Sequence, residues 1–97
     1  MLGSMSENHA AELQVFVEAG CELCRRALHL AEEVDGAYPG LAVRVIDVSE
    51  AAEHRDDVFA VPTFVLNGRV FSLGNPKQSF LREAIESLLR GAGSGVD

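Results

Sequence analysis

The stretch ELQVFVEAGCELCRR, residues 12–26, decides the fold of this chain. Its opening, residues 12–17, is rich in β-branched and aromatic side chains and alternates only partly, which predicts a strand buried on both faces. Gly20 interrupts this pattern, and from Cys21 onward the apolar residues follow a helical spacing. Cys21 and Cys24, the two cysteines of the chain, therefore lie where a strand passes into a helix.

The predicted helix carries one apolar stripe and ends at Asp35-Gly36. The stripe consists of Leu23, Ala27, Leu30, Ala31 and Val34, with Cys24 and Leu28 beside it. Residues 41–48, LAVRVIDV, predict a second strand with the same signature of heavy burial. A strand, a helix and a strand form a βαβ unit, so we expect the two strands to run parallel through a right-handed crossover.

A short helix is predicted next, over residues 50–57. The sequence DVSE, residues 47–50, resembles a capping box in which Asp47 caps the helix and Glu50 reaches back to it. Few residues of this segment are apolar, and its acidic side chains are typical of a solvated helix face.

The second half of the chain predicts a hairpin and a final helix. Two extended runs, residues 64–66 and 69–71, flank Asn67-Gly68, which is the strongest short-range signal for a tight β-hairpin. Asn75 and Pro76 then offer an N-cap and a first helical residue. Apolar residues repeat with helical spacing from there up to Gly91.

The length of 97 residues accommodates one small domain. We expect residues 1–11 to be a cloning remnant and a flexible N-terminus, residues 12–90 to form the domain, and residues 91–97 to be a disordered tail. The net charge of −7 disfavours nucleic acid and anionic membranes as partners. No secretory signal and no apolar run near the roughly 20 residues of a membrane span are present, so a cytoplasmic monomer is expected.

The order of predicted elements and three motifs together resemble the thioredoxin superfamily. The motifs are the early CxxC at the start of the first helix, Val61-Pro62-Thr63 ahead of the hairpin, and the terminal helix. The small size, without an extra N-terminal strand and helix, makes the chain most similar to glutaredoxins and glutaredoxin-like proteins. The resemblance covers residues 12–89 and implies an α/β fold, β-α-β-(α)-β-β-α, with a four-stranded mixed sheet flanked by helices.

The position of the cysteines predicts thiol–disulfide exchange through a mixed disulfide. Cys21 sits where the helix begins, so free backbone N–H groups and the helix dipole favour its thiolate and make it the expected nucleophile. Cys24 lies one turn further along the same face, within reach of a disulfide, and is the expected resolving thiol. No metal or organic cofactor is needed for this step.

Charged neighbours of the cysteines are expected to tune the dithiol. Glu22 disfavours the Cys21 thiolate, whereas Arg25 and Arg26 offset that effect if they fold back toward the first turn. The sequence leaves the balance between them open. A destabilised thiolate makes the disulfide a weaker oxidant, so we favour a reductase as the direction of the reaction.

The resemblance also implies a substrate groove. Pro62 would be cis and lie opposite the CxxC, Val61 would offer its backbone to an extended substrate, and Thr63 belongs to the same motif. Gly74 occupies the place where glutaredoxins carry Gly-Gly and acidic residues that hold glutathione, but here one glycine precedes Asn75-Pro76. The implied partners are a disulfide-containing protein or a low-molecular-weight thiol, with glutathione as a possible co-substrate.

Other interpretations of the same residues stay open. The cysteines could be two buried small residues, one half of a metal or iron–sulfur site shared between two chains, or a sensor in a non-enzymatic binding module. A site within one chain is disfavoured because a single CxxC supplies only two of about four ligands. Glu18 and Asp47, at strand ends near the cysteines, are candidates for relaying protons to Cys24, although solvation and capping are their more common roles.

Overall fold

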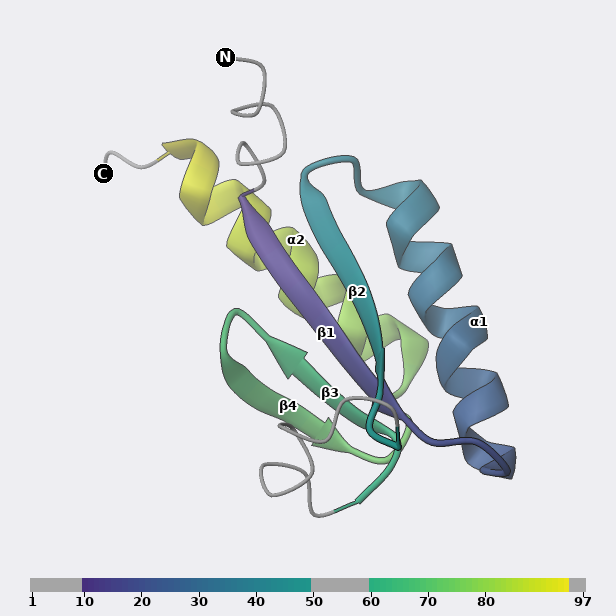
Figure 1. Ribbon diagram of the computed structural model, residues 1–97. Helices are drawn as coiled ribbons and strands as arrows, with labels where there is room; N and C mark the ends of the chain where they lie inside the picture. The colour runs from purple at the N-terminus through teal and green to yellow at the C-terminus, as the bar shows by residue number, and fades with distance from the viewer. Residues whose placement is uncertain (1–9, 50–59, 95–97) are drawn as a thin grey trace.

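The computed structural model describes residues 10–49 and 60–94, with side chains as far as residue 91. Four strands and two helices are formed in these ranges, in the order β1, α1, β2, β3, β4, α2 (Figure 1). Their bounds are Ala11–Val17 for β1, Glu22–Ala37 for α1, Leu41–Asp47 for β2, Thr63–Leu66 for β3, Arg69–Leu73 for β4 and Gln78–Ser94 for α2. The short helix predicted over residues 50–57 lies outside the described residues.

The strands form one mixed sheet in the order β2-β1-β3-β4. Strands β1 and β2 pair in parallel across the α1 crossover, while β3 is antiparallel to both of its neighbours. The predicted βαβ unit and four-stranded mixed sheet are therefore confirmed. Because β1 is an internal strand, its side chains are mostly buried, and its carboxyl end delivers the chain directly to Cys21.

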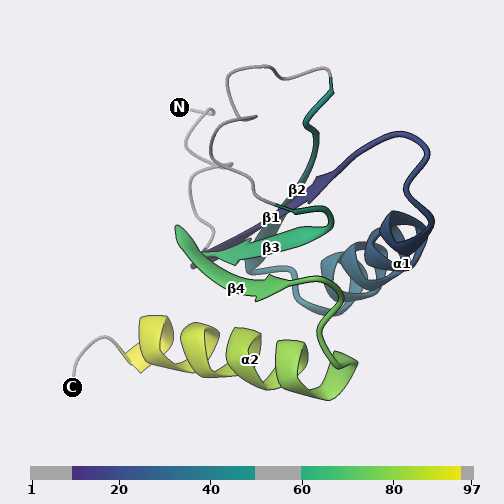
Figure 2. The same cartoon turned by 90° about the horizontal axis from the view of Figure 1, so that it is seen from below.

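Both helices cover the same face of the sheet (Figure 2). The main core is formed by odd-numbered residues of β1, by residues of β3 and by the inner faces of the helices, including Leu13, Val15, Phe64, Leu81 and Ile85. The alternation of side chains along β1 sends Phe16 to the opposite face, where it packs with Ile46 and Val48. The apolar helix faces thus fix α1, and the cysteines at its start, against the sheet.

The apolar stripe of α1 is buried as predicted except at its first position, where Cys24 takes the place of Leu23. The buried positions are Cys24, Ala27, Leu30, Ala31 and Val34, whereas Leu23 is 61% exposed. Successive helical residues are about 100° apart, so a stripe that buries Cys24 turns Leu23 outward. The helix also runs to Ala37, one residue past the predicted end at Gly36.

Strand β2 is less buried than its sequence predicts. Arg44 and Val45 are exposed, and the strand ends at Asp47. Among the described strands β2 lies at one edge of the sheet, with β1 as its neighbour. An edge strand of β-branched residues has the same sequence signature as a buried one, which accounts for the error.

The predicted hairpin is confirmed. Strands β3 and β4 are joined by Asn67 and Gly68, whose φ angles of +51° and +81° are those of a two-residue turn with both central residues left-handed. The Asn67 side chain accepts a hydrogen bond of 2.8 Å from the backbone N–H of Glu12. This contact ties the turn to the beginning of β1.

Helix α2 begins later than predicted. The first helical hydrogen bond runs from the Leu81 N–H to the carbonyl of Lys77, at 3.0 Å, so Lys77 occupies the N-cap position. Asn75, the predicted cap, lies two residues earlier and directs its side chain elsewhere. The helix also continues past the predicted end at Gly91, as far as Ser94.

Polar contacts join α1 to α2 along the surface. Gln78 donates a hydrogen bond of 2.6 Å to the Glu33 carboxylate. At the end of α1, the Tyr38 hydroxyl donates to Glu86, and the Arg82 guanidinium lies 5.3 Å from the centre of the Tyr38 ring. The hydrogen bond with Glu86 raises the pKa of Tyr38 above its usual value. These contacts brace the two helices against each other away from the cysteines.

Candidate active site at the start of helix α1

A tight turn carries the chain from β1 to Cys21. The Cys21 N–H donates to the carbonyl of Glu18 at 3.3 Å, and Gly20 within this turn has a φ of +81°, which side-chain-bearing residues rarely adopt. The glycine that marked the end of the strand pattern is therefore needed for the turn itself. The turn brings Cys21 to the N-terminus of α1, as predicted.

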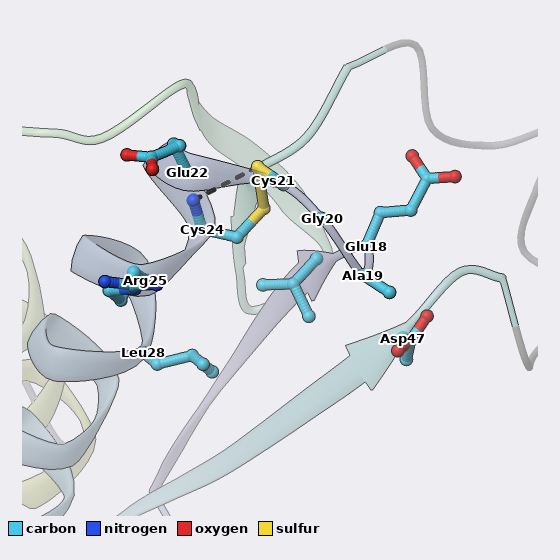
Figure 3. A pocket seen from close by; sticks show the side chains of 10 residues that line it. Glu18, Ala19, Gly20, Cys21, Glu22, Cys24, Arg25, Leu28 and Asp47 are labelled. Atoms are coloured by element: carbon cyan, nitrogen blue, oxygen red, sulfur yellow. Dashed lines mark hydrogen bonds between the residues drawn. A yellow bond between two sulfur atoms is a disulfide. The ribbon is translucent and has the colours of Figure 1, made fainter.

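Cys21 is the N-cap residue of α1. Its backbone is extended, with φ −93° and ψ 112°, and its Sγ accepts a hydrogen bond of 3.1 Å from the backbone N–H of Cys24 (Figure 3). The same N–H also lies 3.2 Å from the Cys21 carbonyl. A sulfur in this position receives the partial positive charge of the helix start, which favours the thiolate once the dithiol is reduced.

The two sulfurs are bonded to each other and differ in exposure. Cys21 and Cys24 form a disulfide with a Cα–Cα separation of 5.2 Å. Cys24 is only 3% exposed and belongs to the main core, whereas Cys21 is half-buried. An incoming thiol or disulfide can therefore reach the sulfur of Cys21 and not that of Cys24.

An open pocket of about 490 Å³ lies beside the disulfide, on the side of β2 (Figure 3). Glu22 and Arg25, the predicted tuning residues, both line it, together with Glu18 and Asp47. Glu22 and Arg25 are exposed, and within the described residues they form no ion pair with each other. Figure 3 shows the Glu22 carboxylate turned away from the sulfurs. Its influence on Cys21 is thus a screened charge effect rather than a contact.

The loop ahead of β3, which the resemblance implied to contact substrate, contains the predicted cis proline. The peptide bond between Val61 and Pro62 is cis, and Pro62 is buried. The Gly74 N–H donates a hydrogen bond of 2.7 Å to the Pro62 carbonyl, which brings two of the predicted residues together. No backbone hydrogen bond joins the N–H or the carbonyl of Val61 to another of the described residues. None of these three residues lines the pocket on the β2 side.

Thr63 lies beneath the loop rather than on it. Its side chain is 3% exposed, and its hydroxyl donates a hydrogen bond of 2.5 Å to the carbonyl of Ala60. As the first residue of β3 it pairs with Phe16 of β1. Its side chain therefore positions the loop and is not presented to a ligand.

Asn75 contributes a contact that the sequence did not indicate. Its Nδ2 donates a hydrogen bond of 3.0 Å to the carbonyl of Leu23, the residue between Glu22 and Cys24 in the motif. The sequence suggested a cap for α2 because Asn followed by Pro is the usual pattern at a helix start. A contact between residues 52 apart in the chain has no local signal.

The two candidates for a proton relay differ in their surroundings. Asp47 is half-buried, and its Oδ1 accepts hydrogen bonds from Ser49, at 2.9 Å from the N–H and 2.5 Å from the hydroxyl. These bonds close a local turn after β2. The predicted capping box pairs Asp47 with Glu50, which lies outside the described residues, so the box stays a prediction. Glu18 is exposed. Both line the pocket of Cys24, so a relay through either one stays a prediction.

The described part of the chain contains no group of three or more His, Cys, Asp or Glu residues that could hold a metal ion. None of the helices in that part is long and apolar enough to cross a membrane.

A purely structural disulfide does not require one sulfur at a helix N-terminus within reach of solvent and the other in the core. This pair is arranged for exchange, and the protein is a thiol–disulfide oxidoreductase. Residues 11–86 match the family model described as thioredoxin domain. The chain belongs to the thioredoxin family.

Individual relatives agree with this assignment. A thioredoxin from Methanocaldococcus jannaschii is 33% identical over 81 residues, which are 80% of this chain and 95% of the relative. A thioredoxin h from poplar has a TM-score of 0.72 at 24% identity, covering 91% of this chain and 83% of its own. Fasciola hepatica thioredoxin has a TM-score of 0.65 at 26% identity, covering 89% and 88%. The expected superfamily, fold and reaction class are confirmed, and likeness to glutaredoxins in particular stays a prediction.

Proposed function

We propose that this protein reduces disulfide bonds in other proteins, with Cys21 as the attacking thiol and Cys24 as the resolving thiol. The observation that carries the proposal is the asymmetry of the pair. Cys21 is half-buried and caps α1, whereas Cys24 is 3% exposed and faces the core. The accessible sulfur is the one whose anion the helix stabilises, so a substrate disulfide meets Cys21 first.

The reaction proceeds by two exchanges. The Cys21 thiolate attacks one sulfur of the substrate disulfide, forms a mixed disulfide and releases the other substrate sulfur as a thiolate. Cys24 then loses its proton and attacks the Cys21 sulfur, which releases the second substrate thiolate and closes the Cys21–Cys24 disulfide. Two electrons pass from the dithiol to the substrate, and an external thiol reductant, which is itself oxidised to a disulfide, has to restore the reduced protein.

The surroundings of the loop support a polypeptide substrate. The Val61 backbone has no hydrogen-bond partner among residues 10–49 and 60–94 and can form strand-like hydrogen bonds with an extended segment, next to Pro62 and Gly74. Leu73, paired with Thr63 at the end of β4, and Leu23, joined to Asn75, are each 61% exposed. Exposed apolar side chains of this size near the loop favour a protein surface as substrate over a small charged thiol.

Glutathione is a weaker candidate for the substrate. Gly74 uses its N–H on Pro62, and the residues after it are Asn75, Pro76 and Lys77, without the acidic pair that would hold an amino group. The proposal also includes a monomer in a reducing compartment, for which the cytoplasm is the natural choice. A reductase with only these two cysteines has to be kept reduced by its surroundings.

The test compares two substrates under matched conditions. The rate constant kcat/KM is measured for a two-chain protein disulfide and for a glutathione mixed disulfide, each with dithiothreitol as reductant and with the uncatalysed rate subtracted. We expect the protein disulfide to be favoured by about tenfold or more, and both activities to vanish in the Cys21→Ser variant. A preference for glutathione would contradict the assigned substrate, and no turnover of either would indicate a sensor or a binding module.

A further inference from the structure

One peptide group at the active site has hydrogen bonds on both sides. It is the group that links Leu23 to Cys24. Its N–H donates to the Sγ of Cys21 at 3.1 Å, and its carbonyl accepts from the Nδ2 of Asn75 at 3.0 Å. The peptide that contacts the attacking sulfur is therefore also held by a side chain from the segment between β4 and α2.

The orientation of the Asn75 amide is fixed by chemistry. A backbone carbonyl can only accept a hydrogen bond, so the NH₂ group and not the oxygen of Asn75 has to face Leu23. A carbonyl oxygen has two lone pairs and can accept this bond in addition to the helical one from the N–H four residues on. The contact with Asn75 thus adds to the helix without replacing one of its bonds.

The other side of the amide shows that this contact has a cost. The Oδ1 of Asn75 is buried and has no hydrogen-bond partner among the described residues. A buried acceptor without a partner destabilises the folded state, and an apolar side chain at this position would avoid it. The buried oxygen of the Asn75 amide lowers the stability of the fold. The contribution of this side chain is therefore the hydrogen bond from its NH₂ group to the Leu23 carbonyl.

The backbone next to Asn75 is held by two hydrogen bonds, one of them to Pro62 in the loop ahead of β3. The preceding residue, Gly74, donates its N–H to the carbonyl of Pro62 at 2.7 Å, and its own carbonyl accepts the Ser72 hydroxyl at 2.8 Å. Both bonds fix the backbone next to the amide. The loop beside Pro62 therefore fixes the amide that meets the CxxC turn.

We propose that Asn75 is a positioning residue that strengthens the hydrogen bond from the Cys24 N–H to the Cys21 sulfur, and so stabilises the Cys21 thiolate. A hydrogen bond on a peptide carbonyl polarises the group and makes its N–H a better donor. In the oxidised protein this N–H meets a weakly accepting disulfide sulfur, whereas in the reduced protein it meets a thiolate. The gain is therefore larger in the reduced state, and Asn75 raises the reduction potential of the pair.

The experiment measures the rate of Cys21 alkylation by iodoacetamide as a function of pH in a Cys24→Ser background, which keeps the backbone N–H. Asn75→Ala is expected to slow alkylation about threefold near neutral pH, whereas the limiting rate at high pH should be equal or slightly higher, because a less stabilised thiolate is a stronger nucleophile. The potential of the Asn75→Ala variant with both cysteines present is expected to become more negative. Asn75→Asp, which cannot donate to Leu23 when ionised and adds a negative charge, is expected to slow alkylation further.

Gln78→Ala is the matched control. Gln78 also uses a side-chain amide to join the start of α2 to α1, but its partner is Glu33, away from the cysteines. It should leave the alkylation rate and the potential unchanged. The charged groups that line the pocket beside Cys21, namely Glu18, Glu22, Arg25 and Asp47, are the same in all these variants except for the added charge of Asn75→Asp. Removal of the neutral Asn75 amide therefore tests the hydrogen bond.

Two results would overturn the proposal. One is an unchanged alkylation profile for Asn75→Ala in a variant whose unfolding midpoint shows that it is folded. The other is an equal slowing by Gln78→Ala, which would indicate a general effect of helix docking. The inference rests on Cys21 as the attacking thiol, but alkylation needs no substrate. If the turnover assay fails while Asn75→Ala still slows alkylation, the proposed substrate is wrong and the role of Asn75 stands.

Discussion

The segment before α2 is hydrogen-bonded to the first turn of α1, and the two helix starts are completed in opposite ways. Helix α1 is capped by the side chain of Cys21, a residue rarely used for this purpose, which accepts the Cys24 N–H. Helix α2 has a good capping residue nearby in Asn75, yet Asn75 contacts α1, and Lys77 occupies the N-cap position. The start of α1 thus carries the reactive sulfur of Cys21. Asn75, which could have capped α2, is bonded to α1 instead.

At both N-cap positions the residue present stabilises its helix less than an ordinary cap would. Ser, Thr, Asp and Asn are the usual N-cap residues, and replacing such a residue by a poor one costs about 1 kcal/mol. A thiol cap at α1 and a lysine cap at α2 are both weaker than these alternatives. The first departure is at the disulfide itself, and Asn75, which is not used as the second cap, is bonded to Leu23 next to Cys24. Substitutions that restore ordinary caps should therefore separate stability from activity.

The largest expected effect follows from restoring the cap of α1. Cys21→Ser places a hydroxyl oxygen where Sγ accepts the Cys24 N–H. We expect complete loss of disulfide reduction, because the hydroxyl is not a nucleophile at neutral pH. The unfolding free energy should equal that of the reduced wild-type protein or exceed it by up to about 1 kcal/mol. Turnover assays and urea titration of both proteins in reductant measure the two effects, and residual turnover would remove Cys21 from its assigned role.

Cys24→Ser keeps the cap and removes only the resolving sulfur. The N–H of residue 24 still donates to Cys21, so the first exchange should proceed at a rate near that of the wild-type protein. The mixed disulfide should then accumulate as a stable adduct, because no second thiol can release it. Mass spectrometry after mixing with a small aromatic disulfide measures the adduct. Failure to form one, in a variant that is folded, would contradict the order of attack.

Restoring a cap at α2 should affect stability alone. Lys77→Ser is expected to gain about 1 kcal/mol from capping and to lose about 0.5 kcal/mol from the contact of Lys77 with the Phe80 ring, which lies 5.5 Å away. The net gain of about 0.5 kcal/mol should appear in urea titration, with the rate of Cys21 alkylation unchanged. Lys77→Ala, which loses the ring contact without gaining a cap, is the control and should be less stable than wild type.

The sequence predicted the parts of the fold that depend on local patterns. Residues 12–17 had a strand composition, Asn67-Gly68 had the turn that a hairpin requires, and Cys21 followed the glycine that ends the strand. These features depend on neighbours in the chain, so their spacing was enough to place them. The position of Cys21 at the helix start, on which the chemistry depends, was among them.

The errors arose where distant contacts overrule local preference. Leu23 was assigned to the buried stripe by its spacing, but burial of Cys24 turned the helix so that Leu23 faces outward. Asn75 was assigned as a cap, but its amide bonds to the Leu23 carbonyl of α1 instead. Both errors concern residues that the hydrogen bond from Asn75 to the Leu23 carbonyl joins. A single sequence has no pattern for such a contact, and only the packed structure reveals it.

The smallest expected effect concerns charge rather than hydrogen bonding at the α1 start. Glu22 is the acidic residue in the first turn of α1, next to Cys21, and is exposed. Its negative charge disfavours the thiolate, so Glu22→Gln should speed Cys21 alkylation at neutral pH and raise the potential, the reverse of the change expected for Asn75→Ala. The gain should be about twofold at low salt and should disappear in 1 M salt, where the screening length is about 3 Å. Glu32→Gln, further along the same helix and also exposed, should change neither quantity. If Glu22→Gln has no effect even at low salt, the reactivity of Cys21 is set by the backbone and by Asn75, and the acidic residue in the motif serves only the helix.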